Sequence, residues 1–303
     1  MFEIVFLGTG ASVPSRDRSL PCVAVRQGRT ISLFDCGEGS QRQLMVSPLS
    51  FMKVDRIFIS HMHGDHILGL PGLLQTMGMS GRKKPVTVFG PVGIGKALGS
   101  MMDACEGELE YELVVKELEG GETFDFDGFS VTSFPTVHNT PSVGYLYRED
   151  DRPGTFRKSE AERLGLRPED YSRLQAGETV DGVRPEQVIG PVRPGCSMVY
   201  TGDTVPCESI EKASEGADVL IHEATYTADD SELAVSHFHS TSKSAAETAV
   251  RCKVRMLALI HISNRYGDAE ESLAEAKAIF EDTVAPSDMQ MLTVTEGGIR
   301  LSE

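Results

Sequence analysis

The stretch ISHMHGDHILGL, residues 59–70, crowds three histidines and an aspartate into six consecutive positions between two apolar runs. The apolar residues RIFIS that lead into it predict a buried strand, and Gly64 permits a tight turn into a helix. Imidazole nitrogens and carboxylate oxygens are common protein ligands of transition metals. The stretch therefore predicts a metal site where a strand meets a helix, with four ligands in His61, His63, Asp65 and His66.

Three further apolar runs each end in a residue that can bind metal. His138 closes the run FSVTSFPTV, Asp203 follows SMVYTG, and His261 ends RMLALI. Ligands at strand ends converge on one edge of a sheet, so these residues are expected to join the first four. Seven ligands are too many for one tetrahedral ion and suit two. We expect Asp203 to bridge two ions, one held by His61, His63 and His138 and the other by Asp65, His66 and His261.

The remainder of the chain predicts a globular α/β protein. Its 303 residues are 40% hydrophobic and 24% charged, which are the proportions of a folded protein with an ample core. Strand-like runs come in series and then alternate with helical patterns, which favours sheets covered by helices. Helical patterns fit residues 67–78, 92–105, 208–215, 241–252 and 270–282.

Composition also limits the location and the partners of the protein. No apolar stretch is long enough to span a bilayer, and the first residues, MFEIVFLGTG, have a strand pattern and not that of a signal segment. The six cysteines are scattered without a CxxC pair, which favours reduced thiols and a cytoplasmic protein. The formal net charge of −16 argues against a general nucleic-acid-binding surface and leaves only local basic groups for that purpose.

Residues 149–195 differ from the rest of the chain. They are polar, rich in proline and glycine, and lack strands that could form a core. We interpret them as an arm inserted into a single domain that spans residues 1–303. The arm contains eight lysines and arginines against ten carboxylates, so a contact with nucleic acid would depend on the pattern of its charges and not on their sum.

Several short motifs accompany the metal ligands. They are FLGTGASVPS near the start, DCGEGSQRQ at 35–43, GDT at 202–204, HEAT at 222–225, HST at 239–241 and HISNRY at 261–266. Together with HxHxDH they resemble the metallo-β-lactamase superfamily and, within it, the short-form ribonuclease Z family, along essentially the whole chain. The resemblance implies a four-layered αββα sandwich with an inserted flexible arm, two zinc ions (Zn2+) per subunit and a homodimer. It also implies that the substrate is precursor tRNA, whose elbow the arm grips.

The activity that the resemblance implies is that of an endoribonuclease that removes the 3′ trailer from precursor tRNA. A metal-bound hydroxide would hydrolyse the phosphodiester and leave a 3′-hydroxyl on the tRNA, with Asp65 as a metal ligand and proton acceptor. His239 of the HST motif is expected to protonate the leaving ribose oxygen, and Glu223 of the HEAT motif to orient His239. The roles of His222 and His237 stay open between structural and ligand-supporting ones.

Four further residues are candidates for substrate binding. The loop VPSRDRS, residues 13–19, stands where many members of the family have a Pro-x-Lys-x-Arg-Asn pattern. An arginine replaces the lysine and Ser19 replaces the asparagine, so the nucleotide that marks the cut stays open. We expect substrate contacts from two arginines of this loop and phosphate contacts from two residues near His261, namely Arg16, Arg18, Ser263 and Arg265.

Two other functions remain open. A superfamily hydrolase of small phosphodiesters or sulfate esters would use the same metal site but would not need the arm. A catalytically dead RNA-binding relative would not need a complete set of metal ligands, and the seven candidates in this sequence speak against it.

Overall fold

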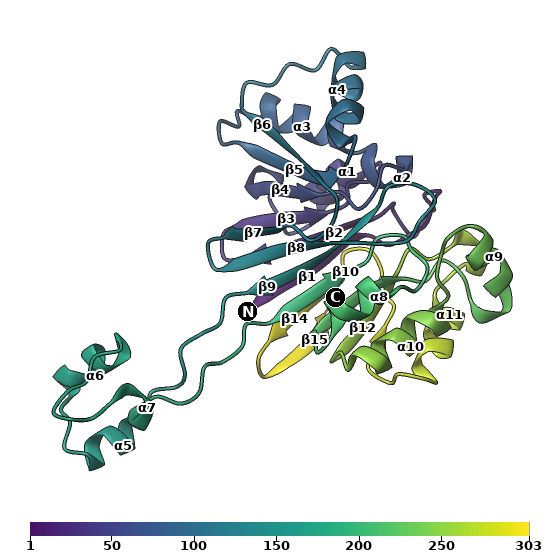
Figure 1. The fold of residues 1–303 in the computed structure, drawn as a ribbon. Coiled ribbons are helices and arrows are strands. Elements are labelled where there is room, and N and C mark those ends of the chain that lie inside the picture. Colours follow the sequence, from purple (N-terminus) through teal and green to yellow (C-terminus); the bar gives the residue numbers. More distant parts are fainter. Residues whose placement is uncertain (303) are drawn as a thin grey trace. The chain divides into compact units, whose positions relative to one another are not determined.

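In the computed structural model, which describes residues 1–302, two β-sheets lie face to face with helices over both outer surfaces (Figure 1). Within these residues the first sheet has eight strands, in the order β15(Gly298–Ser302), β14(Met291–Thr295), β1(Phe2–Gly8), β2(Cys22–Gln27), β3(Thr30–Phe34), β4(Val54–Phe58), β5(Val86–Pro91) and β6(Leu113–Leu118). The second sheet of the described chain has seven, in the order β13(Thr283–Val284), β12(Met256–Ile260), β11(Val219–Glu223), β10(Ser197–Tyr200), β9(Val143–Glu149), β8(Phe129–Pro135) and β7(Thr123–Phe126).

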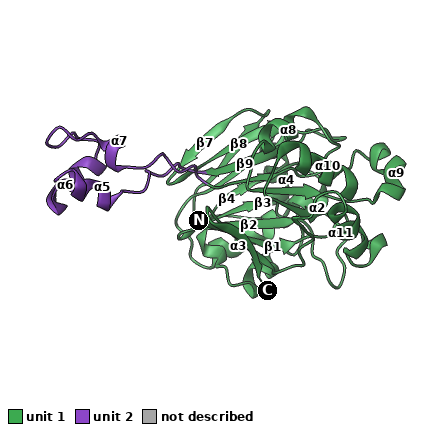
Figure 2. Cartoon of the chain, turned by 90° about the horizontal axis from the view of Figure 1, so that it is seen from below, with its two compact units in different colours: residues 1–148, 196–303 green, residues 149–195 purple. Residues whose placement is uncertain are grey.

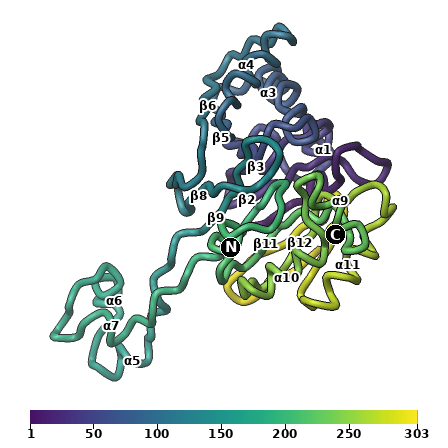
Figure 3. Tube along the Cα trace, turned by 45° about the vertical axis from the view of Figure 1, so that its right-hand side comes forward, coloured from purple at the N-terminus to yellow at the C-terminus, as the bar shows by residue number. Residues whose placement is uncertain are grey.

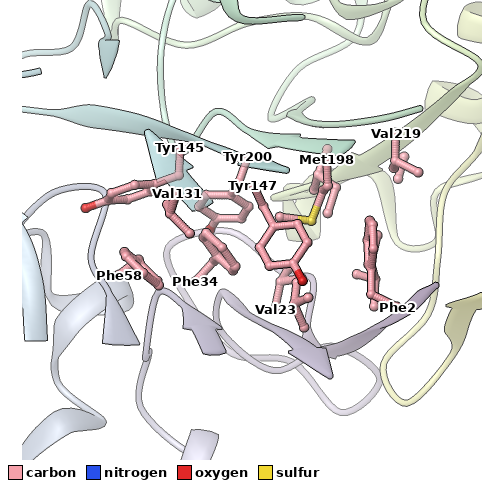
Figure 4. Close-up of a cluster of buried hydrophobic side chains, with 14 of the residues drawn as sticks. Phe2, Val23, Phe34, Phe58, Val131, Tyr145, Tyr147, Met198, Tyr200 and Val219 are labelled. Atoms are coloured by element: carbon pink, nitrogen blue, oxygen red, sulfur yellow. The ribbon is translucent and has the colours of Figure 1, made fainter. Parts of the chain in front are cut away.

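Clusters of buried apolar side chains fill the spaces between these layers. The first lies between the two sheets and is rich in aromatic rings, with Phe34 stacked on Phe58 at 5.2 Å between ring centroids (Figure 4). A second packs the first sheet against α1(Ser40–Val46), α3(Leu70–Met79) and α4(Ile94–Ala104). A third packs the second sheet against α8(Glu208–Ser214), α10(Ser242–Cys252) and α11(Glu270–Lys277). Figure 3 shows α3 and α4 on one side of the sandwich and α10 and α11 on the other, which confirms the predicted αββα architecture.

The topology explains why polar residues gather at one place. Strands β3 to β6 are parallel neighbours in the first sheet, and β10 to β13 are parallel neighbours in the second. The carboxyl ends of parallel strands meet at the same edge of a sheet. Strand β4 leads to His61, β10 to Asp203 and β12 to His261. Residues that are distant in the sequence are therefore delivered to one region.

The five predicted helices correspond to α3, α4, α8, α10 and α11, with ends that differ by a few residues. In α10 the boundaries have a clear local cause. The Thr241 hydroxyl accepts a hydrogen bond from the Ser244 N–H at 3.0 Å, and Lys253 ends the helix in the left-handed region at φ 55°. No helix within residues 1–302 combines the length and the apolar character needed to cross a membrane.

Residues Glu149–Gly195 form a compact unit, distinct from the unit made by Met1–Arg148 and the chain from Cys196 onward (Figure 2). The inserted unit contains the short helices α5(Lys158–Arg163), α6(Pro168–Gln175) and α7(Pro185–Val188). Although its sequence is mostly polar, the inserted unit has a small apolar core of its own. The core is formed by Ala161, Leu166, Leu174, Val180, Val183 and Val188. At its base, Arg152 and Arg193 exchange backbone hydrogen bonds of 2.9 Å in both directions, which brings the two ends of the unit together.

Candidate metal centre

The structure brings together all seven candidate metal ligands. His61 and His63 follow β4, Asp65 and His66 belong to α2(Gly64–Ile67), and the other three follow β8, β10 and β12, namely His138, Asp203 and His261. Their ligand atoms fall into two groups, each with its atoms within 4.8 Å of one another. The first group contains His61, His63, His138 and Asp203, and the second contains Asp65, His66 and His261.

Asp203 lies between the two groups. Its Oδ2 is 3.3 Å from both His66 Nε2 and His261 Nε2 in the second group, and 3.7 Å from His61 Nε2 in the first. Two ligands of a tetrahedral zinc ion with bonds of about 2.1 Å are separated by about 3.4 Å. The carboxylate of Asp203 is therefore placed where it can serve ions in both groups.

Hydrogen bonds at the outer nitrogens aim the histidines at this centre. In four of them Nδ1–H donates away from the centre, so that Nε2 carries the free lone pair that a metal requires. The acceptors are Ser60 Oγ for His61 (3.0 Å), Asp35 Oδ2 for His66 (2.7 Å), the Phe238 carbonyl for His138 (2.9 Å) and Thr225 Oγ1 for His261 (2.7 Å). The inner nitrogens of His66 and His261 then face each other at 3.4 Å. From these positions both nitrogens can offer a lone pair to the same cation, so the donor set fits metal ions.

The charges of the centre also fit cations. Burial disfavours the ionised form of Asp65, but hydrogen bonds with His261 and His66 outweigh burial and hold the pKa of Asp65 well below its usual range. Burial has the same effect on Asp203, whose pKa is nevertheless held well below its usual range by His261 and His66. Burial disfavours charge on His66 as well, yet the carboxylates of Asp203 and Asp35 raise the pKa of His66 well above that of a free imidazole. The ionised carboxylates thus attract positive charge to the centre.

Asp35 supports the second group, although the sequence analysis assigns it no role. It is fully buried and has a φ of 58°, a conformation that is rare outside glycine and persists only when its surroundings enforce it. Besides His66, it accepts hydrogen bonds from the Ser60 N–H at 2.7 Å and the Tyr200 hydroxyl at 2.6 Å. The signal that could have found it is the aspartate directly after the apolar run ISLF, the pattern that identifies Asp203.

His239 and Glu223 form a hydrogen-bonded pair beside the metal ligands. His239 Nδ1–H donates to Glu223 Oε1 at 2.9 Å, and the same oxygen accepts from the Thr204 N–H at 3.0 Å. Burial disfavours charge on His239, but the Glu223 carboxylate outweighs burial and raises the pKa of His239 to about 9. His239 also forms a third group of possible ligands with Asp203 and His261, yet its Nδ1 is committed to Glu223. An imidazole that is held at Nδ1 and keeps Nε2 for a substrate has the form of a general acid.

Thr225 connects this pair to the second group of ligands. Its hydroxyl donates to Glu223 Oε2 at 2.6 Å and accepts from His261 Nδ1–H at 2.7 Å. One threonine of the HEAT motif therefore orients both the partner of His239 and a metal ligand. This role is not predictable from the HEAT motif alone, because the sequence does not show which groups the hydroxyl contacts.

The two histidines whose roles stayed open lie outside both ligand groups. His222 is fully buried in β11, and its Nδ1–H donates to the Glu223 carbonyl at 2.7 Å. Burial lowers the pKa of His222, which favours the neutral imidazole inside the strand. His237 Nδ1 lies 3.2 Å from the Tyr226 hydroxyl, and the His237 ring stacks on the Tyr226 ring.

Three of the four candidate substrate-binding residues have polar groups near the surface. Arg16 is exposed, and Ser263 is half-buried at the start of η3(Asn264–Tyr266). Arg265 is exposed, with its guanidinium carbon 5.0 Å from the centre of the Tyr226 ring. The Arg265 Nη1 also pairs with Asp230 Oδ2 at 3.3 Å.

Arg18 differs from the other three, and the geometry corrects its expected role. It is only 8% exposed, and its Nη1 donates to Thr9 Oγ1 at 2.6 Å and to the Pro286 carbonyl at 2.9 Å. Arg18 therefore anchors its loop to the body of the protein and does not present its charge to a substrate. Ser12, directly before this loop, contacts the metal centre, because its N–H donates to Asp65 Oδ2 at 2.9 Å.

Comparisons with known proteins give the family. The family model described as Anti-Pycsar protein Apyc1 matches residues 2–152, and the one described as Beta-lactamase superfamily domain matches residues 174–262. A protein named Ribonuclease Z from Methanosarcina acetivorans is 41% identical over 97% of this chain and 98% of its own length. Another of the same name, from Bacillus licheniformis, is 42% identical over 94% of this chain and 97% of its own length. The chain belongs to the ribonuclease Z family.

Solved structures agree with membership of the ribonuclease Z family. Human tRNase Z, short form, is 28% identical and has a TM-score of 0.72, with 97% of this chain and 99% of the human chain covered. The metallo-β-lactamase fold protein YhfI from Bacillus subtilis, at 18% identity and a TM-score of 0.71, shares the fold. This member of the ribonuclease Z family thus combines the metallo-β-lactamase fold with two groups of residues that can hold metal.

Proposed function

We propose that this member of the ribonuclease Z family is a zinc-dependent endoribonuclease that removes the 3′ trailer from precursor tRNA and leaves a 3′-hydroxyl on the tRNA. Full-length similarity to proteins named Ribonuclease Z and to a tRNase Z structure supports the reaction and the substrate. The observation that carries the proposal in this chain is the position of the His239–Glu223 pair beside two groups of metal ligands that share Asp203.

Two zinc ions match the donors in the centre. Zinc prefers histidine nitrogens and carboxylate oxygens in tetrahedral arrangements. We assign His61, His63 and His138 to one ion, and Asp65, His66 and His261 to the other, with Asp203 between them. When bound, the ions supply Lewis acidity, which lowers the pKa of water and stabilises negative charge on the phosphate oxygens.

The side chains of the protein supply the proton transfers. The Asp65 carboxylate, which its histidine neighbours keep ionised, accepts a proton from the attacking water. The Ser12 N–H fixes the orientation of that carboxylate. His239, held at Nδ1 by Glu223, donates a proton from Nε2 to the leaving 3′ ribose oxygen, which is a poor leaving group without it.

The inserted unit, Glu149–Gly195, is proposed to bind the elbow of the tRNA. It contributes no residue to either group of metal ligands. Its side chains Arg163 and Arg167 are 72% and 78% exposed, and each has a carboxylate partner within its own unit. Exposed pairs of this kind are weak, so these guanidinium groups can exchange a carboxylate for an RNA phosphate at small cost.

We further propose that the protein is a cytoplasmic homodimer. The cytoplasm is supported by the six cysteines, which are all free, since a reducing compartment keeps thiols in that state. The homodimer is the expectation from the family resemblance. Sedimentation equilibrium tests it, because a species with twice the mass of one chain supports the dimer and a monomer at assay concentrations excludes it.

Incubation with a precursor tRNA that carries a 3′ trailer tests the proposed activity. We expect a single cut that leaves a 3′-hydroxyl on the tRNA, is lost on exhaustive chelation and returns with added zinc. Rapid hydrolysis of a small phosphodiester or sulfate ester with no cut in precursor tRNA would instead favour the small-ester hydrolase. Binding of precursor tRNA without turnover of any substrate would favour the catalytically dead relative.

A further inference from the structure

Phe238 has a backbone conformation that its residue type disfavours. Helix α9(Ser231–Ser236) ends in a pair of hydrogen bonds, from the Phe238 N–H to the Val235 carbonyl at 3.2 Å and from the His239 N–H to the Ala234 carbonyl at 2.8 Å. This pair of bonds is the Schellman motif, which requires a left-handed residue at the position of Phe238 and is usually met by glycine. Phe238 has a φ of 60°. A bulky side chain in this region is an outlier that calls for a reason.

Packing in the protein core does not explain the left-handed conformation of Phe238. Phe238 is 41% exposed and belongs to none of the hydrophobic clusters. Within residues 1–302 its ring pairs with no other aromatic ring and with no cation. An aromatic side chain normally repays its conformational restriction by burial or by stacking. Within residues 1–302, Phe238 is only partly buried and stacks on no aromatic ring.

The backbone of Phe238 lies at the edge of the metal centre. Its carbonyl accepts the hydrogen bond from His138 Nδ1–H at 2.9 Å, and the next residue in the chain is His239. The rings of His138 and His239 are 5.2 Å apart between centroids. The residue therefore contacts a metal ligand through its carbonyl and directly precedes the proposed general acid.

We infer that the ring of Phe238 stacks on an unpaired base of the RNA next to the scissile phosphodiester. This inference rests on the proposed function. The 3′ end of a precursor tRNA is unpaired beyond the acceptor stem, and unpaired RNA bases stack on aromatic side chains in a sequence-tolerant way. The metal ligands, Asp65 and His239 act on the phosphate and on the leaving oxygen, and none of them holds a base. A stacked base fixes the strand so that the correct phosphodiester meets the centre.

Phe238→Gly separates the role of the ring from that of the backbone. Glycine adopts the left-handed conformation freely, so this variant keeps the helix end and the carbonyl that holds His138. Phe238→Ala removes the ring and keeps the unfavourable conformation, so it should unfold at a lower temperature than Phe238→Gly. Phe238→Tyr retains the stacking surface, and Val235→Ala is a matched control, because Val235 is 70% exposed on the same helix.

The assay compares kcat/KM of these variants on precursor tRNA and on two precursors that lack the base on the 5′ or the 3′ side of the cut. We expect Phe238→Gly and Phe238→Ala to lose about 5- to 150-fold on the complete precursor, and Phe238→Tyr and Val235→Ala to stay near the wild type. On one of the abasic precursors, the difference between Phe238→Gly and the wild type should disappear, because the wild type has no base to stack.

Three results would overturn the inference. They are equal kcat/KM for Phe238→Gly and the wild type on the complete precursor, a loss that persists on both abasic precursors, and a metal content that falls in Phe238→Gly. The last would mean that the ring supports the metal centre itself and not the RNA, because the glycine variant keeps the carbonyl that holds His138. A wild-type protein that does not cut precursor tRNA would instead refute the proposed function, so the two failures are distinguishable.

Discussion

The unit that contains the metal ligands and the inserted unit use charge in opposite ways. In the first, the carboxylates of Asp35, Asp203 and Glu223 are almost completely buried among histidines and hydrogen-bond donors. In the inserted unit the buried core is apolar, with Glu149 at the base as a buried carboxylate, and other charges form exposed pairs such as Arg163 with Glu160 at 2.8 Å. Buried charges are tolerated only when they are rigidly paired, whereas exposed charges remain free to change partners. On the proposed function, catalysis depends on a fixed ionic network, and tRNA binding depends on exposed charges of the separate unit.

The largest effect that this contrast predicts is on the metal. Asp203→Ala should lower the metal content and reduce cleavage of precursor tRNA by at least about 10³-fold, since its carboxylate faces three histidines of both groups. The matched control is Glu160→Ala, which removes an exposed carboxylate from the inserted unit. Mass spectrometry of bound metal, alongside the cleavage assay, checks both variants. Full activity of the Asp203 variant would show that Asp203 is not a metal ligand.

The next effect concerns the proton given to the leaving group. His239→Ala should retain its metal and slow cleavage by about 10²–10⁴-fold, the usual contribution of a positioned acid or base. A substrate with a good leaving group should be less sensitive, because it needs no proton. His237→Ala is the control, since this neighbouring histidine contacts the Tyr226 hydroxyl and lies outside the ligand groups. Loss of metal from the His239 variant would make His239 a ligand and contradict its role as the acid.

Removal of the inserted unit tests the other half of the contrast. Because Arg152 and Arg193 are already paired through their backbones, residues 153–192 can be replaced by a short Gly-Ser linker. Metal content and melting temperature should change little, and cleavage of precursor tRNA should fall by about 10²-fold through weaker positioning. Binding of precursor tRNA by the intact protein should also weaken as salt is added. Unchanged affinity for precursor tRNA in the shortened protein would exclude the unit from substrate recognition.

The sequence predicts the first unit well because single residues there mark strand ends. Each of the seven candidate ligands either follows an apolar run or belongs to the HxHxDH motif. The strands bring them together at one edge of the two sheets. The sequence could not show contacts between residues that are far apart along the chain. Arg16 and Arg18 occur in the same loop, but only Arg18 is buried. Its guanidinium donates to the carbonyl of Pro286, which lies 268 positions further along the chain. Asp35 follows an apolar run as Asp203 does, but its contacts with His66 and Tyr200 could not be predicted from that pattern.

The helices of the inserted unit were missed for a different reason. They are too short to show a 3.6-residue period, so the apolar residues look scattered along a polar segment. Local signals were nevertheless present. Pro168 and Pro185 each open a helix, and Asp170 and Gln187 accept hydrogen bonds from the backbone N–H of the residue before each proline, at 3.0 and 2.9 Å. These capping residues could have predicted the starts of the two helices, which the hydrophobic periodicity does not show.

The smallest effect on activity is expected from a cavity inside the inserted unit. Leu174 is fully buried in the cluster of six apolar residues, so Leu174→Ala should cost about 2–4 kcal/mol of local stability. A core this small cannot absorb such a loss, and the unit should open, with faster hydrogen exchange in α5 and α6. The metal content and the main melting transition should stay the same, and cleavage of precursor tRNA should fall by no more than on removal of the whole unit.

Leu259→Ala is the matched variant in the unit that contains the metal ligands. Leu259 is as buried as Leu174 but lies in β12, near the strand end that leads to His261. It should lower the main melting temperature and leave hydrogen exchange in α5 and α6 unchanged. If Leu174→Ala lowers the main transition as Leu259→Ala does, the two units unfold as one and the contrast between them fails. If each variant affects only its own unit, the arm is an independent folding unit, and the ionic network of the metal centre does not depend on it.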